Sequence, residues 1–449
     1  MDDSALNLDA YFAPSDPDTW RQHVEATLKG RPFEKLIRPT PDGFGIEPLY
    51  TAPPEGYTPG EANHPPFIRG ARTADRRRAG WDIRALHDMG DPTTTAQAIA
   101  DDLERGVHSL WLVPAHHDRP GLALFTAAGL NEALSAVEAT RVAIYLDPGP
   151  HGGAWFATLL AMAHMRGLDP SNLQGAILYD PLGTLAHTGH LPQGFDAAWH
   201  ALAVLTAQAT THAPALRTVG LSGLPYHHAG ASAAQELAAV MATAIATFRH
   251  LEAHNIAPET VAAQSVLQFA VGSHMFMDIA KLRAARLLWS RILTACGVKP
   301  NAPELHVCTS PADLTRRDPW VNILRGTAGC FAAAVAGADA ITVMPFDRAL
   351  GQPDPSAARI ASNTQVVLEA ESHLTRVADP AGGSWAIEHL THTLAQKAWD
   401  TLQAIEAQGG MVVSLKCEGL GVGRMDLRLR SLKGRFIWVG VHADADKGA

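Results

Sequence analysis

The sequence predicts an α/β fold, and within it a (β/α)8 barrel of the TIM type with an extended N-terminal arm and a short irregular C-terminal tail. Two observations carry this prediction. From about Gly70, short apolar, β-rich runs alternate with helical patterns, and eight such runs occur, each followed by a helix. The chain has 449 residues, 47% of them hydrophobic, enough for one large domain with appendages or for two domains. An open, doubly wound sheet of eight strands is the alternative that the same count allows.

The strand and helix patterns follow one another in a regular order. The runs expected to form strands are Ser109–Val113, Val142–Leu146, Gly175–Leu178, Thr218–Leu221, Ser265–Val271, Leu305–Cys308, Ala340–Met344 and Leu374–Ala378. The helical patterns around them are Thr93–Leu103, Gly129–Val137, Trp155–Met165, Ala197–Ala209, Ser232–Leu251, His274–Thr294, Trp320–Ala336, Pro355–Glu371 and Ile387–Gln408. The last strand lies between a helix and a Pro-Gly-Gly loop, where α/β proteins place substrates.

The chain divides into three expected segments: an arm at residues 1–66, the barrel at 67–411 and a tail at 412–449. The arm is rich in Pro and Gly and has one expected helix at Pro17–Lys29. In the tail, the run Phe436–Val441 is long enough for a strand but has no following strand to pair with. We expect a loosely docked, truncated or frame-shifted tail. Its basic residues make a binding patch the alternative; they are Arg424, Arg428, Arg430, Lys433 and Arg435.

Charge and cysteine content exclude several classes of protein. The net charge of -9 disfavours nucleic acid and anionic membrane surfaces as partners. The N-terminus lacks the pattern of a signal peptide, and no apolar run is long enough to span a membrane. The four cysteines are scattered and form no CxxC pair, so neither a disulfide framework nor a zinc site is expected. These features predict a cytoplasmic protein.

Histidine and carboxylate residues gather at the expected strand ends, which meet at one face of a barrel. Imidazole with carboxylate suits a divalent metal, so a metal-dependent barrel hydrolase is an alternative. Against it, the first expected strand has no His-x-His pair, and 22 histidines in one chain make chance clusters common. We therefore expect no metal site. The residues concerned are His116, His117, Asp118, Asp147, His151, Asp180, Tyr226, His227, His228 and His306.

Two further groups of charged residues have a structural and a functional interpretation. Lys281, Arg283 and Arg286 cannot all share one helix face completely, and we expect a solvated surface with salt bridges. Asp347 and Arg348 follow the strand at Ala340–Met344. They either bind a substrate or close the barrel rim.

Several ordered motifs carry a resemblance that runs from about Trp20 to Met411. The chain resembles the family of cobalamin-dependent methylmalonyl-CoA mutases. The matching segments are Lys29-Gly30, Phe33-Glu34-Lys35-Leu36, Asp42-Gly43, Pro48-Leu49-Tyr50-Thr51, Phe67-Ile68-Arg69-Gly70, Trp81-Asp82-Ile83-Arg84, Ala280 to Arg286, Gly337-Ala338-Asp339-Ala340, Asn363-Thr364-Gln365 and Asp379 to Ser384.

The resemblance implies a chemistry as well as a fold. In the family, the barrel admits the CoA chain along its axis, and cobalamin covers one end. A separate C-terminal domain supplies a histidine to cobalt from an Asp-x-His-x-x-Gly motif, and a radical rearrangement of the carbon skeleton follows. This sequence contains no such motif. The resemblance therefore implies adenosylcobalamin at the level of a complex and not as a ligand of this chain alone.

The positions that match the family's catalytic residues carry unsuitable side chains. A tyrosine near the reacting carbons is replaced by Arg76, a histidine that donates to the thioester carbonyl by Pro225, and an arginine that binds the substrate carboxylate falls near Thr188. Pro225 has no N–H to donate. The resemblance thus implies no catalytic residue in this chain. It leaves Arg69, His306, Thr309 and Ser310 as candidate substrate-binding residues.

Two segments, Tyr179 to Gly183 and Tyr226 to Ser232, look like the small, non-catalytic subunit of the heterodimeric bacterial enzymes. The resemblance therefore implies a small subunit that supports a large catalytic chain in the methylmalonyl-CoA/succinyl-CoA isomerisation, with acyl-CoA as a possible ligand. One alternative is an active acyl-CoA mutase with an altered substrate that uses a separate cobalamin-binding chain. The metal-dependent hydrolase is the other.

Overall fold

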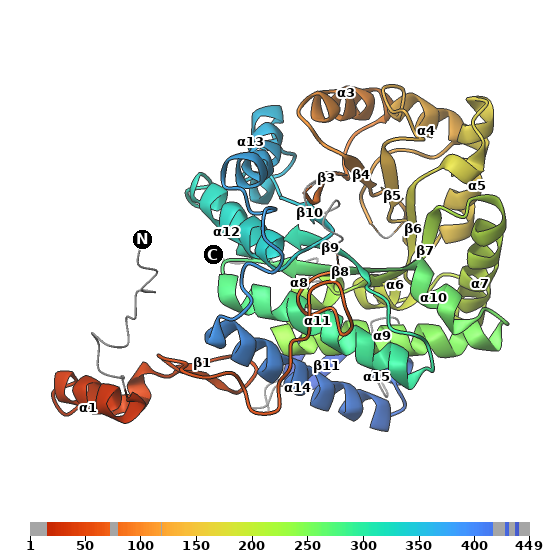
Figure 1. Ribbon diagram of the computed structural model, residues 1–449. Coiled ribbons are helices and arrows are strands. Elements are labelled where there is room, and N and C mark those ends of the chain that lie inside the picture. The colour runs from red at the N-terminus through yellow and green to blue at the C-terminus, as the bar shows by residue number, and fades with distance from the viewer. Residues whose placement is uncertain (1–15, 72–79, 118, 416–426, 431–435, 440–449) are drawn as a thin grey trace, which may run out of the picture.

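The centre of the molecule is a closed barrel of eight parallel strands with helices around it (Figure 1). The computed structural model describes residues 16–71, 80–117, 119–415, 427–430 and 436–439. The strands run in the order β10-β3-β4-β5-β6-β7-β8-β9, so the TIM-type barrel is confirmed and the open sheet is wrong. They are β3 (Asp82–His87), β4 (Ser109–Leu112), β5 (Ala143–Leu146), β6 (Gly175–Tyr179), β7 (Leu216–Ser222), β8 (Ser265–Val271), β9 (Glu304–Thr309) and β10 (Ala340–Thr342).

One strand differs from the sequence prediction. The barrel begins with β3 and closes where Ala340 and Ile341 of β10 pair with Asp82 and Ile83. The run Leu374–Ala378 forms no strand and lies in a loop, where Val377 is exposed. Because β3 carries an acidic and a basic residue among its apolar ones, its sequence does not have the continuous apolar character of a buried parallel strand. The expected eighth strand is therefore wrong, and every other expected strand moves one place along the barrel.

Helices surround the barrel and begin at recognisable caps. Asp91, Asp180 and Ser232 each accept a backbone N–H in the first turn of the helix that follows. The helices are α3 (Pro92–Glu104), α4 (Ala127–Ala133), α5 (Gly152–Met165), α6 (Pro181–Thr188), α7 (Phe195–His212), α8 (Leu224–His228), α9 (Ala233–Ala253), α10 (Pro258–Gln264), α11 (Met275–Ala295), α12 (Val321–Val335), α13 (Pro355–Val366), α14 (Trp385–Ala407) and α15 (Met411–Leu415).

Short helical turns complete the secondary structure. They are η2 (Phe33–Leu36), η3 (Pro170–Asn172), η4 (Pro311–Asp313), η5 (Arg348–Leu350) and the π-helical turn η6 (Val367–Glu371), which continues α13.

Apolar side chains form two separate cores. The larger one lies between the strands and the surrounding helices. The smaller one lies inside the barrel, where side chains from alternate strand positions point inward, and it includes Trp111, Tyr145, Leu178, Val266 and Cys308. The interior of the barrel is therefore packed with side chains.

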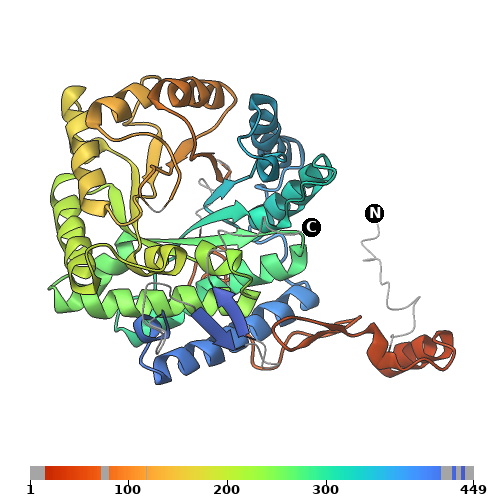
Figure 2. The same ribbon diagram turned by 180° about the vertical axis from the view of Figure 1, so that it is seen from behind.

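The N-terminal segment has a projecting part and an anchored part. Helix α1 (Pro17–Thr27) has no buried residue, and it extends away from the barrel together with the hairpin of β1 (Arg38–Pro39) and β2 (Gly45–Ile46) (Figures 1 and 2). The turn of this hairpin is anchored on the barrel, because Asp42 accepts hydrogen bonds from the Ser232 hydroxyl and from the Ala234 N–H (3.0 Å) at the start of α9.

The three basic residues of α11 are buried, so their expected solvated surface is wrong. Lys281 is 2% exposed and donates to Glu236 Oε2 (2.8 Å). Arg283 contacts both Glu388 oxygens (2.9 and 2.8 Å), and Arg286 donates to the Ala336 carbonyl (2.7 Å). Helix α11 packs against α9, α12 and α14, which leaves it no broad solvated face.

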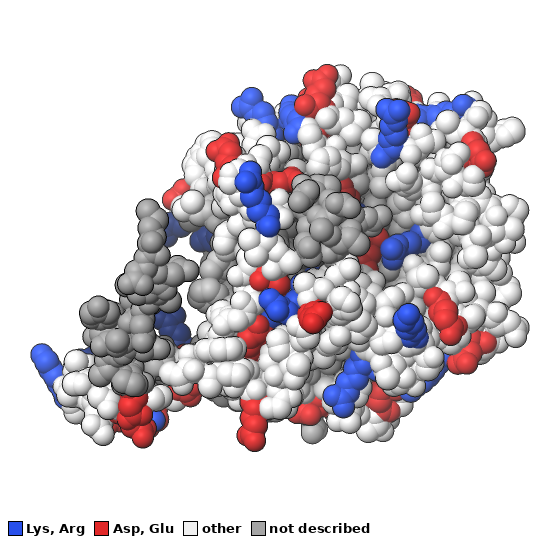
Figure 3. Space-filling model, viewed as in Figure 1, with Lys and Arg blue, Asp and Glu red and all other residues white. Residues whose placement is uncertain are grey.

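The tail contains a second small sheet, in which β11 (Leu427–Arg430) pairs with β12 (Phe436–Val439) in antiparallel fashion. The run Phe436–Val441 was expected to have no strand after it; its partner strand β11 instead precedes it and was not predicted. Arg424, Lys433 and Arg435 lie outside the described residues. On the face seen in Figure 3, basic and acidic residues are scattered singly with both signs intermixed. Within the described residues, no helix combines the length and the apolar character that crossing a bilayer requires.

Candidate functional site

The carboxyl ends of the barrel strands surround a cavity of about 260 Å³, which we call the upper cavity. Active sites of (β/α)8 barrels lie at this face, because loops from every strand meet there. Its charged and polar lining includes Asp88, His116, Arg119, Asp147, Asp180, His187, His228 and Arg348, and its floor is formed by Leu86, Trp111 and Gln268.

Two ion pairs close the rim of the upper cavity. Arg119 donates to Asp147 Oδ2 (2.8 Å) and to the Asp147 carbonyl (3.0 Å). Burial alone would raise the pKa of Asp147, but the Arg119 guanidinium holds that pKa below its usual value. Across the cavity, Arg348 donates to Asp88 Oδ1 (3.0 Å), which ties the loop after β10 to the end of β3. In this structure Arg348 closes the barrel rim.

Asp180 lies at the end of β6 and holds two elements together. Its carboxylate accepts the Gly183 N–H (2.7 Å) at the start of α6 and the Ser222 N–H (3.0 Å) at the end of β7. Burial raises the pKa of Asp180 to about 6, although these hydrogen bonds oppose the rise. Its oxygens are thus engaged in positioning α6.

Two histidines of the upper cavity, His187 and His228, have lowered pKa values that favour the neutral form. Burial, followed by Arg119, lowers the pKa of His187. Burial, with His227 and His187 as further causes, lowers the pKa of His228 to about 4. In the part of the chain that the structure describes, which excludes Asp118, no three His, Cys, Asp or Glu residues come together as a metal site would require. Of the strand-end histidines named from the sequence, His116 and His228 line the upper cavity, and the others lie outside its lining.

Ser310, His227 and Glu236 lie in a row beside the upper cavity, with a hydrogen bond between the first two and a longer ion-pair contact between the last two. The Ser310 hydroxyl lies 2.7 Å from His227 Nε2, and His227 Nδ1 lies 3.7 Å from Glu236 Oε2. This order is also that of a serine nucleophile with its base. However, Ser310 is 2% exposed, and its hydroxyl accepts the Ala312 N–H (3.1 Å). The row therefore connects β9 to α8 and α9 and presents no accessible nucleophile.

His306 lies on the axis of the barrel, below the upper cavity. Its ring nitrogens contact Gln268 Nε2 (3.1 Å) and Thr342 Oγ1 (2.9 Å), and its edge meets the Trp111 ring at 4.9 Å between centroids. Burial, followed by Arg84, lowers the pKa of His306 well below its usual value. A neutral imidazole and an indole thus fill the middle of the barrel.

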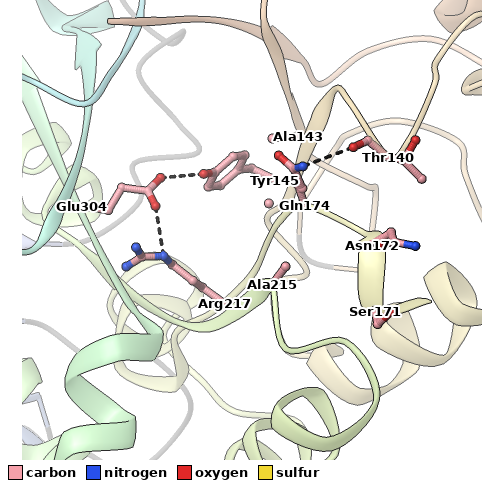
Figure 4. A pocket seen from close by; sticks show the side chains of 10 residues that line it. Thr140, Ala143, Tyr145, Ser171, Asn172, Gln174, Ala215, Arg217 and Glu304 are labelled. Atoms are coloured by element: carbon pink, nitrogen blue, oxygen red, sulfur yellow. Dashed lines mark hydrogen bonds and ion pairs between the residues drawn. The ribbon is translucent and has the colours of Figure 1, made fainter. Parts of the chain in front are cut away.

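A second cavity of about 710 Å³ opens at the amino ends of the strands (Figure 4). There Glu304 accepts a hydrogen bond from the Tyr145 hydroxyl (2.6 Å) and forms an ion pair with Arg217, whose Nε lies 3.1 Å from the Glu304 Oε2. Arg84 stacks on the Tyr145 ring at 3.3 Å. None of the residues that line this lower cavity lines the upper one. The packed layer of Trp111 and His306 lies between them.

The residues singled out by sequence lie in several places. Thr188 and Pro225 line the upper cavity. Arg69 lies outside it and binds Asp379 (3.1 Å) in the loop before α14. His306 is on the axis, and Thr309 and Ser310 end β9, where the Thr309 hydroxyl accepts the Met344 N–H (2.8 Å). Arg76 lies outside the described residues.

Sequence reasoning did not identify Trp111, Arg119 or His187 as parts of the site. Trp111 could have been identified, because alternate residues of the expected strand Ser109–Val113 face the inside of the barrel. Arg119 carries no signal in the sequence, because its partner Asp147 follows a different strand and only barrel closure brings them together. His187 lies in the last turn of α6, well after the capping residue Asp180, and no spacing rule in the sequence points to it.

The closed parallel barrel, with a cavity at the carboxyl ends of its strands, places the protein in the class of (β/α)8-barrel proteins. Comparison with known families then identifies it further: the model of the methylmalonyl-CoA mutase family matches residues 39–420. The chain belongs to the methylmalonyl-CoA mutase family.

The chain is a homologue of small subunits in that family. It is 40% identical over 425 residues to the methylmalonyl-CoA mutase small subunit of Streptomyces virginiae, covering 93% of this chain and 67% of that one. It is 36% identical over 439 residues to the small subunit of Propionibacterium freudenreichii subsp. shermanii (92% and 66%), and 36% identical over 397 residues to the probable small subunit of Mycobacterium tuberculosis (86% and 62%). The chain thus spans about two thirds of the length of these relatives.

Proposed function

We propose that this chain is a non-catalytic small subunit that supports a large catalytic chain in the isomerisation of methylmalonyl-CoA and succinyl-CoA. The observation that carries the proposal is the packed axis of the barrel. Trp111, Tyr145 and His306 are 4%, 7% and 1% exposed, and they occupy the space between the lower and upper cavities. A CoA thioester that entered from the amino ends of the strands would find no passage to the carboxyl ends.

The upper cavity also lacks the groups that the family's chemistry needs. Pro225 has no N–H that could donate to a thioester carbonyl. The Thr188 hydroxyl donates to the Thr184 carbonyl (2.8 Å), and it has no charge to offer a substrate carboxylate. Both positions therefore support the view that this chain does not carry out the reaction itself.

The projecting N-terminal arm supports association with another chain. Helix α1 presents Trp20 and Arg21 against the Phe33 ring, at 6.2 Å between ring centroids and 4.2 Å from the guanidinium carbon. Helix α1, which carries this cluster, lies away from the barrel, while Asp42 anchors the turn of the following hairpin on α9. A helix of this length is marginal in isolation, and a partner surface would stabilise it. We propose the large catalytic subunit as that partner.

We assign adenosylcobalamin to the complex and not to this chain. The donor set of this chain does not fit the cofactor, because none of the 22 histidines stands in an Asp-x-His-x-x-Gly motif. The neutral histidines of the upper cavity are enclosed behind the two ion pairs of the rim. We therefore assign no step of the cobalamin chemistry to this chain.

Purified chain mixed with adenosylcobalamin and methylmalonyl-CoA tests the proposal. We expect no succinyl-CoA above the blank, and a stable one-to-one complex on size-exclusion chromatography when the large chain from the same genome is added. The large chain alone is the control. Turnover by this chain with only a separate cobalamin-binding chain would instead support the alternative of an active mutase with an altered substrate. Metal analysis of the same preparation tests the hydrolase alternative.

A further inference from the structure

The upper cavity has the features of a binding site although the family's catalytic groups are missing from it. We propose that it binds a short-chain carboxylic acid as the free acid, which enters from the carboxyl ends of the strands and is held by Trp111 and Arg119. The proposal goes beyond the role of the chain as a subunit and does not depend on it.

Two buried N–H donors in the lining of the upper cavity have no acceptor. Trp111 is 4% exposed, and its indole N–H makes no hydrogen bond. The Nε–H of Arg119 is likewise buried and unpartnered, although the other nitrogens of that guanidinium bind Asp147. A buried donor without an acceptor is costly and rare in folded proteins. Both orphaned groups are donors, so a ligand that satisfies them must supply acceptor oxygens.

The carboxylates around the cavity do not oppose such a ligand. Asp88 and Asp147 are neutralised by Arg348 and Arg119, and the oxygens of Asp180 accept two backbone N–H groups. His187 and His228 are neutral at pH 7 and can donate a hydrogen bond or take up a proton when an anion binds. The polar lining is thus suited to a carboxylate.

The remaining lining limits the ligand to a short chain. Val113, Leu178, Leu224 and Met344 supply apolar walls on which an alkyl chain would pack. The cavity volume of about 260 Å³ is slightly below the range of about 300–1,000 Å³ typical of small-molecule sites. Because Trp111 and His306 close the floor, a pantetheine chain cannot continue through the barrel. A short free acid fits wholly within this space, whereas propionyl-CoA has no free carboxylate and would leave its pantetheine chain outside the cavity.

Calorimetric titration of the full chain with sodium propionate and sodium succinate tests the proposal. We expect saturable binding of at least one of them with one site per chain. Sodium sulfate, which has oxygens but no alkyl chain, should bind at least tenfold more weakly, and propionyl-CoA should not bind. No binding of either acid at 10 mM, equal binding of sulfate, or binding of propionyl-CoA as tight as that of the free acid would each overturn the proposal.

Matched tryptophan variants show whether Trp111 takes part. Trp111→Phe removes the orphaned indole N–H and should weaken binding about tenfold or more. Trp199 also carries a buried, unpartnered indole N–H, but it lies on α7 against His250, outside the cavity, so Trp199→Phe should leave binding unchanged. Equal affinity in the two variants would overturn the proposal.

A cavity-filling variant covers the case in which Trp111→Phe fails to fold. Thr184→Phe adds a ring to the wall of the cavity from α6 and alters none of the charged groups. It should abolish binding while circular dichroism remains that of the wild type. Undiminished binding by a folded Thr184→Phe chain would place the ligand elsewhere and overturn the assignment. Failure of the chain to bind a large subunit would leave all these results unaffected.

Discussion

The ion pair between Lys281 and Glu236 is almost completely excluded from water. Both side chains are no more than 2% exposed, and the pair is 2.8 Å apart. Burial would raise the pKa of Glu236, but Lys281 and then His227 lower it to about 2. Each buried charge is therefore compensated by the other, and this pairing could not be predicted from the sequence alone.

Replacing Lys281 by Met leaves Glu236 as an uncompensated buried charge. We expect a loss of about 3–5 kcal/mol in the free energy of unfolding, measured by urea denaturation at pH 7. The double variant Lys281→Met/Glu236→Gln should recover part of that loss, because no charge remains buried. A loss below about 1 kcal/mol in the single variant would contradict the argument.

Asp180 makes the stability of the protein depend on pH in a definite direction. Its pKa is raised from 3.8 to about 6, so the folded state favours the protonated form. The stability that Asp180 contributes is therefore fully present below about pH 3.8 and is lost as the pH rises through about 6. Asp180→Asn removes this dependence and keeps a good helix cap. Relative to wild type, it should gain up to about 3 kcal/mol between pH 4 and pH 7.5.

The matching control is Asp169, which caps η3 at the surface by accepting the Ser171 N–H (2.9 Å). Its hydrogen bonds lower the pKa instead of raising it. Asp169→Asn should therefore show no gain relative to wild type as the pH rises. If Asp180→Asn behaved like Asp169→Asn in paired denaturation curves, the raised pKa of Asp180 would be wrong.

At the scale of elements, contacts between distant segments explain what sequence patterns could not predict. Strand β3 was missed because Asp82 and Arg84 point into the barrel, where Arg84 binds Asp82 (2.9 Å) and Ser109 (2.9 Å). Such inward charges interrupt the apolar pattern by which strands are recognised. The other strands carry longer runs of apolar residues and were predicted. The buried face of α11 was missed for the same reason, since its partners Glu236 and Glu388 lie far away in sequence.

The site was predictable only in part, because contacts between segments that are distant in the sequence could not be predicted. Thr188 and Pro225 were named through the resemblance to the mutase family, as positions of replaced catalytic residues, and they line the upper cavity. The ion pairs Arg119–Asp147 and Arg348–Asp88 join loops from different strands, so they exist only once the barrel has closed. Their roles could be derived from geometry but not from spacing along the chain.

The anchoring of the arm on α9 gives a prediction for these elements. Asp42 supplies acceptors for the first turn of that helix, so Asp42→Ala should cost about 1–2 kcal/mol in stability. Hydrogen exchange should quicken at residues 40–46 because the hairpin loses its anchor. Asp16→Ala removes a comparable cap, but on exposed α1, and should leave exchange at residues 40–46 unchanged. Unaltered exchange in Asp42→Ala would show that other contacts hold the hairpin.

At the scale of the whole molecule, the barrel and the arm differ in what holds them in place. The barrel is stabilised by two cores and by buried ion pairs, whereas no residue of α1 is buried. Removing α1 should therefore change the free energy of unfolding of the barrel only slightly. This difference supports the proposal that α1 contacts another chain.

Deletion of residues 1–29 tests whether the helix contributes to the stability of the fold or to binding of the large chain. Since α1 contributes no buried residue, the melting temperature of the truncated chain should stay within a few degrees of the full chain. Its affinity for the large catalytic chain should fall at least tenfold in a titration, because the Trp20 and Arg21 cluster on Phe33 is lost. The milder variant Trp20→Ala should show a smaller loss in the same direction. Full affinity in the deletion would mean that the partner docks on the barrel itself, and a large drop in melting temperature would mean that the arm stabilises the fold directly.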